Sequence, residues 1–217
     1  MNRLQVKICG VTNVEDARAC ADLGADMIGL NFYPQSARYI RPQHARKIIE
    51  AIPRGVRAVG VFVDPTASEV RSIAKSVGLE YVQLHGNVAP ETCRELAGEF
   101  RVIRAFSTDG QFKPEDVHSF LECDVILDAH HAELRGGTGL TCDWSLARAT
   151  LPFARFLILS GGLDAQNLGD AIAIVGPHAV DVCSGVETAP GVKNHRAIEE
   201  FIAATRAAEH LRVDPSH

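Results

Sequence analysis

The chain alternates between short β-prone runs and amphipathic helical segments from one end to the other, and this alternation constrains its fold most. We expect eight strands, at Leu4–Cys9, Asp26–Tyr33, Val56–Val63, Tyr81–Leu84, Val102–Phe106, Asp124–Asp128, Phe156–Leu159 and Val180–Cys183. Apolar residues recur at helical spacing between them, as at Ala45, Ile48, Ile49 and Ile52. A strand followed by a helix eight times over predicts an α/β protein, a closed (β/α)8 TIM barrel of parallel strands with an outer ring of helices.

A doubly wound open parallel sheet is the competing fold. No G-x-G-x-x-G motif follows the first strand, which weighs against a dinucleotide-binding site of the kind found in such sheets. Helix start signals support the alternation. They are a capping box at Thr66–Glu69, prolines at early helical positions (Pro42 and Pro90), and possible N-caps at Asn13, Asp164 and Asn194. The helical pattern is weakest near Pro114–Phe120 and short near Trp144–Ala149.

The length of 217 residues suits one domain, which we place at residues 1–211, with a disordered tail at 212–217. The net charge of −5 argues against nucleic acid and membrane surfaces as partners, and no segment has the length of a transmembrane helix. The six cysteines form no C-x-x-C pair, and the N-terminus has no apolar leader. We therefore expect reduced thiols and a cytoplasmic location.

Three glycine blocks begin at residues 136, 160 and 184, a constant step of 24 residues. The first is Gly136–Gly139; the second contains Gly161 and Gly162, and the third contains Gly185. The last two directly follow the last two expected strands, where barrels of this type commonly bind phosphate through backbone N–H groups. These blocks predict a phosphorylated small-molecule ligand, although glycines after strands are often only turns.

Chemically active side chains stand where expected strands end, which is the active-site end of a barrel. Cys9 is a candidate base, with Lys7 on the same strand face to favour its thiolate; the alternative is a small buried hydrophobic residue. Asp128 is a candidate general acid whose pKa burial would raise; the alternative is a helix cap or loop ion pair.

Two further features are less specific. Arg38 lies in the loop after the second strand, where it would clamp a carboxylate or simply be solvated. His130 and His131 suggest a metal, but the second expected strand offers no histidine, and a site needs three or four convergent ligands, so we expect no metal.

Taken together, these segments resemble the phosphoribosylanthranilate isomerase family of tryptophan biosynthesis. The matching motifs occur in family order from residue 6 to about residue 200. They are Lys7–Gly10, Ser36–Ile40, Gly60–Phe62, Val82–Gly86, Gly136–Gly139, Leu159–Leu163 and Asp181–Lys193.

The resemblance implies a cofactor-free Amadori rearrangement of N-(5-phosphoribosyl)anthranilate to 1-(2-carboxyphenylamino)-1-deoxyribulose 5-phosphate. It implies that Asp128 is the general acid that helps open the furanose ring and that Cys9 is the general base that removes the C2′ proton. The remaining site residues follow from the same match. Arg38 is expected near the anthranilate carboxylate, Asp181 near the sugar hydroxyls, Gln83 and His85 on the anthranilate side, and Gly137, Gly161, Gly162, Ser184 and Gly185 around the phosphate.

The sequence departs from the usual family pattern at Ser160, Cys142, Cys183 and Asn194, and none of these is the proposed acid or base. Three alternatives stay open: a metal-dependent pentose-phosphate epimerase, the histidine-pathway aminoaldose isomerase, and a non-catalytic phosphoribosyl-binding barrel. The histidine-pathway substrate carries two phosphates, but the turns after the early strands contain no second glycine cup. The sequence gives no oligomeric state.

Overall fold

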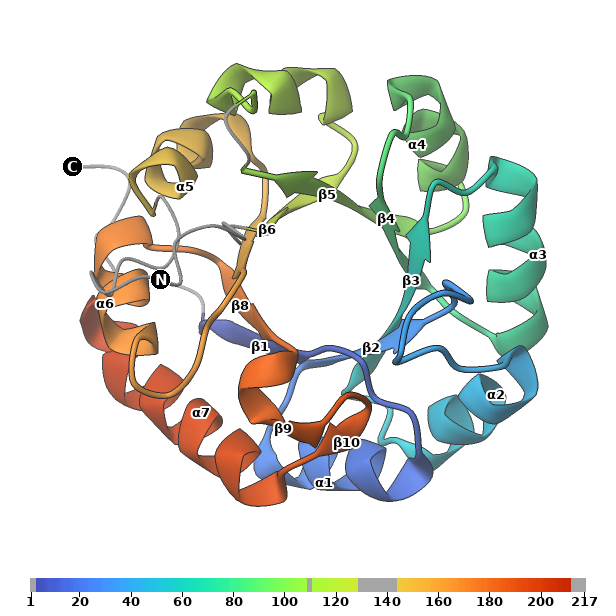
Figure 1. Cartoon of the computed structure of the whole chain (residues 1–217). Helices are drawn as coiled ribbons and strands as arrows, with labels where there is room; N and C mark the ends of the chain where they lie inside the picture. The colour runs from blue at the N-terminus through green and yellow to red at the C-terminus, as the bar shows by residue number, and fades with distance from the viewer. Residues whose placement is uncertain (1–2, 109–110, 129–143, 212–217) are drawn as a thin grey trace.

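Eight parallel strands close into a barrel in chain order, as the computed structural model shows (Figure 1). The structure describes residues 3–108, 111–128 and 144–211. The strands are β1 Gln5–Ile8, β2 Met27–Asn31, β3 Arg57–Val63, β4 Tyr81–His85, β5 Arg101–Ser107, β6 Asp124–Asp128, β7 Leu157–Ser160 and β8 Ala179–Val182. The closing contact joins β1 to β8, with Lys7 opposite Asp181 and Ile8 opposite Val182. The predicted barrel is confirmed, and the open sheet is wrong.

Helices surround the barrel on its outer side (Figure 1). They are α1 Val14–Leu23, α2 Pro42–Ala51, α3 Ala67–Val77, α4 Pro90–Ala97, α5 Trp144–Thr150, α6 Leu168–Val175 and α7 His195–Ala208. The segment with the weakest helical pattern is a 3-10 helix, η1, at Pro114–Phe120. Short 3-10 helices η2 (Leu151–Phe153) and η4 (Glu209–Leu211) follow α5 and α7. None of the helices in the described part of the chain is long and apolar enough to cross a membrane.

Most of the expected helix caps are present. Asn13 and Asn194 accept hydrogen bonds from backbone N–H groups at the starts of α1 and α7, and Thr66 and Glu69 form a reciprocal capping box. The expectation for Asp164 is wrong, because α6 begins only at Leu168 and its N-cap is Asn167. The Asp164 carboxylate instead accepts from the N–H groups of Gln166 and Asn167, and so stabilises the turn before the helix.

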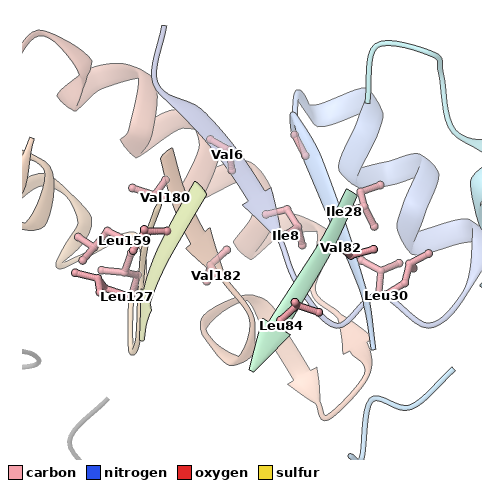
Figure 2. Packing of buried hydrophobic residues seen from close by; sticks show 14 of the residues in the cluster. Val6, Ile8, Ile28, Leu30, Val82, Leu84, Leu127, Leu159, Val180 and Val182 are labelled. Atoms are coloured by element: carbon pink, nitrogen blue, oxygen red, sulfur yellow. The ribbon is translucent and has the colours of Figure 1, made fainter. Parts of the chain in front are cut away.

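Alternate strand residues face the helices and the barrel interior. The helix-facing layer contains apolar side chains of β1, β2, β4, β6, β7 and β8, namely Val6, Ile8, Ile28, Leu30, Val82, Leu84, Leu127, Leu159, Val180 and Val182 (Figure 2). A smaller inner cluster is formed by Met27, Val59, Ile103, Ala105, Ile126, Ile158 and Ala179. By the same alternation Lys7 and Asp181 lie on the inner face, so the barrel core becomes polar at β1 and β8.

An antiparallel hairpin that the sequence reasoning missed lies between β8 and α7. After the 3-10 helix η3 (Ser184–Val186), it consists of β9 (Glu187–Ala189) and β10 (Val192–Lys193), joined at Pro190-Gly191. The Thr12 hydroxyl donates to the Gly191 carbonyl at 2.6 Å, which attaches the hairpin to the loop after β1. Residues 212–217, expected to form a disordered tail, lie outside the described part of the chain.

Candidate active site

A cavity of about 290 Å³ opens where β6, β7 and β8 end. Its lining combines charged side chains with the two late glycine loops: Arg38, Asp128, Ser160, Gly161, Gly162, Leu163, Asp181, Val182, Cys183, Ser184 and Gly185. The structure therefore brings together most of the site residues expected from the sequence. Cys9 is not in this lining, but it lies beside Cys183, which is.

The loops after β7 and β8 pack backbone against backbone. A Cβ atom on Gly185 would lie 2.3 Å from the Leu163 carbonyl oxygen, so only glycine fits there. Gly161 and Gly162 have φ angles of 95° and 66°, which favour glycine. Within the described ranges, the N–H groups of Gly161, Gly162, Ser184 and Gly185 donate to no protein acceptor. Such free donors at the edge of a cavity suit an anion. Gly137 lies outside the described residues.

A buried ion pair crosses from β1 to β8 below the cavity. The Lys7 ammonium donates to one carboxylate oxygen of Asp181 at 2.7 Å, and the Ser160 hydroxyl donates to the other at 3.0 Å. Burial works against the charge on Lys7, but Asp181 and Cys9 together outweigh it and hold the pKa of Lys7 above its ordinary value. Asp181 is thus held in place at the cavity wall by Lys7 and Ser160.

Cys9 immediately follows β1, and its N–H donates to the Val182 carbonyl at 2.8 Å. Hydrogen bonding with the Cys183 thiol is the largest influence on Cys9 and, together with the charge of Lys7, lowers the pKa of Cys9 to about 7 against the effect of burial. The expected help from Lys7 is therefore present. The larger contribution comes from Cys183, which the sequence singled out only as a departure from the family pattern.

Glu187 on the hairpin accepts hydrogen bonds from two cations, one distant in the chain (Arg38) and one on the same hairpin (Lys193). Arg38 donates to its carboxylate through Nε and Nη2 at 2.6–3.0 Å, and Lys193 donates through Nζ at 2.9 Å. The interpretation of Arg38 as a merely solvated loop residue is therefore wrong. Glu187 and Lys193 were missed as site residues because only tertiary contacts reveal their roles; the sequence signal was their place in the Asp181–Lys193 motif.

Gln83 and His85 lie on β4, with their Nε2 atoms 2.5 Å apart. Burial, assisted by the charge of Lys7, lowers the pKa of His85 to about 4, so its ring is neutral at neutral pH. His85 lines a second cavity of about 540 Å³ together with Arg104, Phe106, Phe112 and Asp128. Asp128, at the end of β6, thus lines both cavities and stands between them.

The metal hypothesis rested on His130 and His131, which both lie outside the described residues. Within residues 3–108, 111–128 and 144–211, no group of three or more His, Cys, Asp or Glu side chains is arranged to hold a metal ion.

Comparison with known proteins agrees with this geometry. The sequence model of the N-(5′-phosphoribosyl)anthranilate (PRA) isomerase family matches residues 6–204. The N-(5′-phosphoribosyl)anthranilate isomerase of Thermotoga maritima is 44% identical over 199 residues, which cover 92% of this chain and 97% of that protein.

Solved structures are similar over nearly the whole chain. The crystal structure of phosphoribosyl anthranilate isomerase from Thermotoga maritima superposes with a TM-score of 0.87 at 41% identity, covering 94% of this chain and 99% of that one. A phosphoribosyl anthranilate isomerase in complex with reduced 1-(o-carboxyphenylamino)-1-deoxyribulose 5-phosphate gives a TM-score of 0.83 at 41% identity, with the same coverage.

Proposed function

The chain belongs to the N-(5′-phosphoribosyl)anthranilate isomerase family, and on this premise we propose which of its side chains perform the reaction. The enzyme is an aldose–ketose isomerase of L-tryptophan biosynthesis. It converts N-(5-phosphoribosyl)anthranilate into 1-(2-carboxyphenylamino)-1-deoxyribulose 5-phosphate by an Amadori rearrangement. The substrate must therefore be held by its phosphate, opened at its sugar ring and deprotonated at C2′.

The phosphate binds at the glycine loops after β7 and β8. The N–H groups of Gly161, Gly162, Ser184 and Gly185, which donate to no acceptor in the described part of the chain, supply the hydrogen bonds. Gly137 lies outside the described residues and stays a predicted phosphate contact. Fixing the phosphate here places the sugar between Asp181 and Asp128, which line the same cavity.

Asp128 is the general acid. Its position at the end of β6, on the wall of both cavities, puts it beside a sugar whose phosphate lies at β7 and β8. Asp128 donates its proton to the furanose ring oxygen as the bond between that oxygen and C1′ breaks. The nitrogen lone pair forms the new double bond to C1′, and the product is an open-chain protonated imine.

Cys9 is the general base, and its thiolate removes the proton from C2′. The electron pair of that C–H bond forms the C1′–C2′ double bond, while the iminium nitrogen takes up its own pair again. The protonated imine is therefore the electron sink, and the reaction needs no cofactor. A base with a pKa near the working pH is effective in such a step, and the pKa of Cys9 is about 7.

The remaining polar groups orient the substrate. Glu187 contacts Arg38 through Nε and Nη2, so Nη1 of Arg38 is the group that binds the anthranilate carboxylate. Asp181 accepts hydrogen bonds from the sugar hydroxyls, and Gln83 and His85 lie on the anthranilate side. A cytoplasmic location stays a prediction.

The observation that carries this assignment is the shared cavity of Arg38, Asp128, Asp181 and the glycine loops, with Cys9 next to it. The test follows the fluorescence of the anthranilate moiety during turnover. We expect Cys9→Ser to lower kcat by about 10²–10⁴-fold, the usual contribution of a positioned base. Cys20→Ala, which changes a thiol buried in α1, should keep the parent rate.

Turnover of Cys9→Ser at the parent rate would contradict the base assignment. The same assay with EDTA separates this mechanism from that of a metal-dependent epimerase, because a reaction through Asp128 and Cys9 continues at an unchanged rate. Growth of a tryptophan auxotroph that lacks this isomerase provides an independent check of the activity in cells.

A further inference from the structure

Cys9 and Cys183 stand side by side where β1 and β8 end. Each directly follows the paired residues Ile8 and Val182, and the Cys9 N–H donates to the Val182 carbonyl at 2.8 Å. Neighbouring strands lie about 4.8 Å apart, within the range of about 4.4–6.8 Å that separates the Cα atoms of disulfides. The Cys183 sulfur also leans toward β1, because a Cβ on Gly10 would lie 3.0 Å from it.

We propose that Cys9 and Cys183 form an oxidation site, in which a peroxide converts the two thiols into a disulfide that a dithiol reductant reopens. Lys193 holds the two backbones in place, since its Nζ donates to the carbonyl oxygens of Cys9 and Cys183 at 2.5 and 3.3 Å. Bond formation therefore joins two residues that are already neighbours and needs little backbone movement.

The two sulfurs also differ in the way that disulfide formation requires. Cys9 has its pKa lowered to about 7, whereas the pKa of Cys183 is raised by its hydrogen bond to Cys9 and by burial, so above about pH 7 the pair holds mainly one thiolate and one thiol. The Cys9 thiolate attacks peroxide and displaces hydroxide, which leaves a sulfenic acid. The Cys183 sulfur then attacks Cys9, loses its proton and expels water. Two thiols lose two electrons in total, and peroxide is reduced to two waters.

Access separates this pair from a second one in the same chain. Cys9 and Cys183 are partly exposed, and Cys183 lines the active-site cavity, so a small oxidant reaches them. Cys93 and Cys123 also interact through their thiols, but they are 0% and 1% exposed in the helix-facing core. Proximity alone would predict both disulfides, whereas proximity with access predicts only the first. The core pair is therefore an internal control.

The consequence for turnover rests on the proposed function. If Cys9 is the base, a disulfide removes the only species of Cys9 that accepts a proton, and the enzyme stops until it is reduced. Binding of a phosphorylated substrate at Ser184 and Gly185 would also shield the adjacent Cys183 from the oxidant.

The test treats the folded enzyme with hydrogen peroxide, quenches it and measures mass and activity. We expect the intact mass to fall by two hydrogens, and trypsin to release peptide Ile8–Arg18 joined to peptide Phe156–Lys193. Activity should fall at least about 10-fold, in line with loss of a general base, and dithiothreitol should restore it. In Cys183→Ser the joined peptide should be missing, and Cys9 should instead gain oxygen.

Two outcomes would overturn the oxidation site: the two peptides stay separate after peroxide, or the bond forms between Cys93 and Cys123 instead. The outcomes also separate this inference from the proposed function. A joined peptide with full activity would support the oxidation site and overturn Cys9 as the base. Separate peptides, together with an inactive Cys9→Ser, would overturn the oxidation site and leave the base assignment standing.

Discussion

Cys9 owes its reactivity to groups from three parts of the chain. Lys7 on the same strand and Lys193 on the hairpin favour its thiolate, the Asp181 carboxylate opposes it, and the neighbouring Cys183 thiol donates a hydrogen bond to it. Burial alone would raise the pKa of a thiol. The hydrogen bond and the two cations therefore have to outweigh both burial and Asp181, and the resulting pKa is about 7.

A pH profile tests this balance. Cys9 acts as a base only in its deprotonated form, and its pKa of about 7 lies below the ordinary thiol value. We expect the acidic limb of the kcat/KM profile to lie at that pKa, with a tenfold fall per pH unit below it, because kcat/KM reports the free enzyme. Cys183→Ala removes the donor and should move this limb to higher pH. A limb in the same place in both proteins would contradict the role of Cys183.

Lys7 serves both stability and the site. Lys7→Met leaves the buried Asp181 carboxylate without its cation. Because the Asp181 side chain is only 5% exposed, we expect a loss of about 3–5 kcal/mol in unfolding free energy. The pKa of Cys9, followed by the pH dependence of its alkylation rate, should rise. Urea unfolding measures the first effect. The double variant Lys7→Met/Asp181→Leu should regain most of the stability, since no unpaired charge is left; equal losses in both proteins would contradict this account.

Among the elements, the loops after β7 and β8 connect fold and function most directly. Gly185→Ala would place a methyl group against the Leu163 carbonyl and push the two loops apart. A displacement of about 1 Å at a binding group lowers the reaction rate by up to about 10²-fold. We therefore expect kcat/KM to fall by about 10–100-fold, mainly through a higher KM. Substrate titration of the purified variant measures it.

Gly169 is the matched control for this prediction. It lies in α6, and a Cβ there meets nothing within 4 Å. Gly169→Ala should keep KM and raise the unfolding free energy by up to about 1 kcal/mol, because alanine favours the helix. If both variants raised KM equally, backbone contact between the loops would not be the cause.

The elements themselves were predictable where local physics decides them. Asn13, Thr66 and Asn194 cap the helices that their spacing predicts, and β6 spans Asp124–Asp128 as expected. The hairpin at Glu187–Lys193 was not predicted, because its strands are too short for any alternation to be visible. Local sequence also cannot show that Glu187 fixes Arg38, since the two are 149 residues apart in the chain.

At the scale of the whole molecule, barrel closure turns distant residues into neighbours. The rule that the C-terminal ends of the strands face the active site selected Cys9 and Asp128 from the sequence, whereas Asp181 followed from the family resemblance. The rule gives no register between β1 and β8, so it could not show that Cys9 meets Cys183 or that Lys7 meets Asp181, whose numbers differ by 174. The sequence therefore proposes a set of site residues that the fold brings close together, but it does not give the contacts between them.

The two ends of the barrel should also separate stability from catalysis, and β6 carries one aspartate at each end. Asp124 begins the strand, on the face opposite the site, and accepts from Arg101 at 2.7 and 2.8 Å and from Arg155 at 3.2 Å. Asp124→Asn weakens these charged hydrogen bonds, so we expect a loss of about 1–3 kcal/mol in unfolding free energy with kcat retained.

For Asp128→Asn, four positions along the same strand, we expect kcat to fall by about 10²–10⁴-fold, because the ring oxygen loses its proton donor. Both variants make the same chemical change, so its location is the only difference between them. Urea unfolding and the fluorescence assay on each protein measure the two effects. If Asp124→Asn lost as much kcat as Asp128→Asn, the two ends of β6 would be coupled. The place of Asp128 at the carboxyl end of the strand would then no longer be a reason to assign it as the acid.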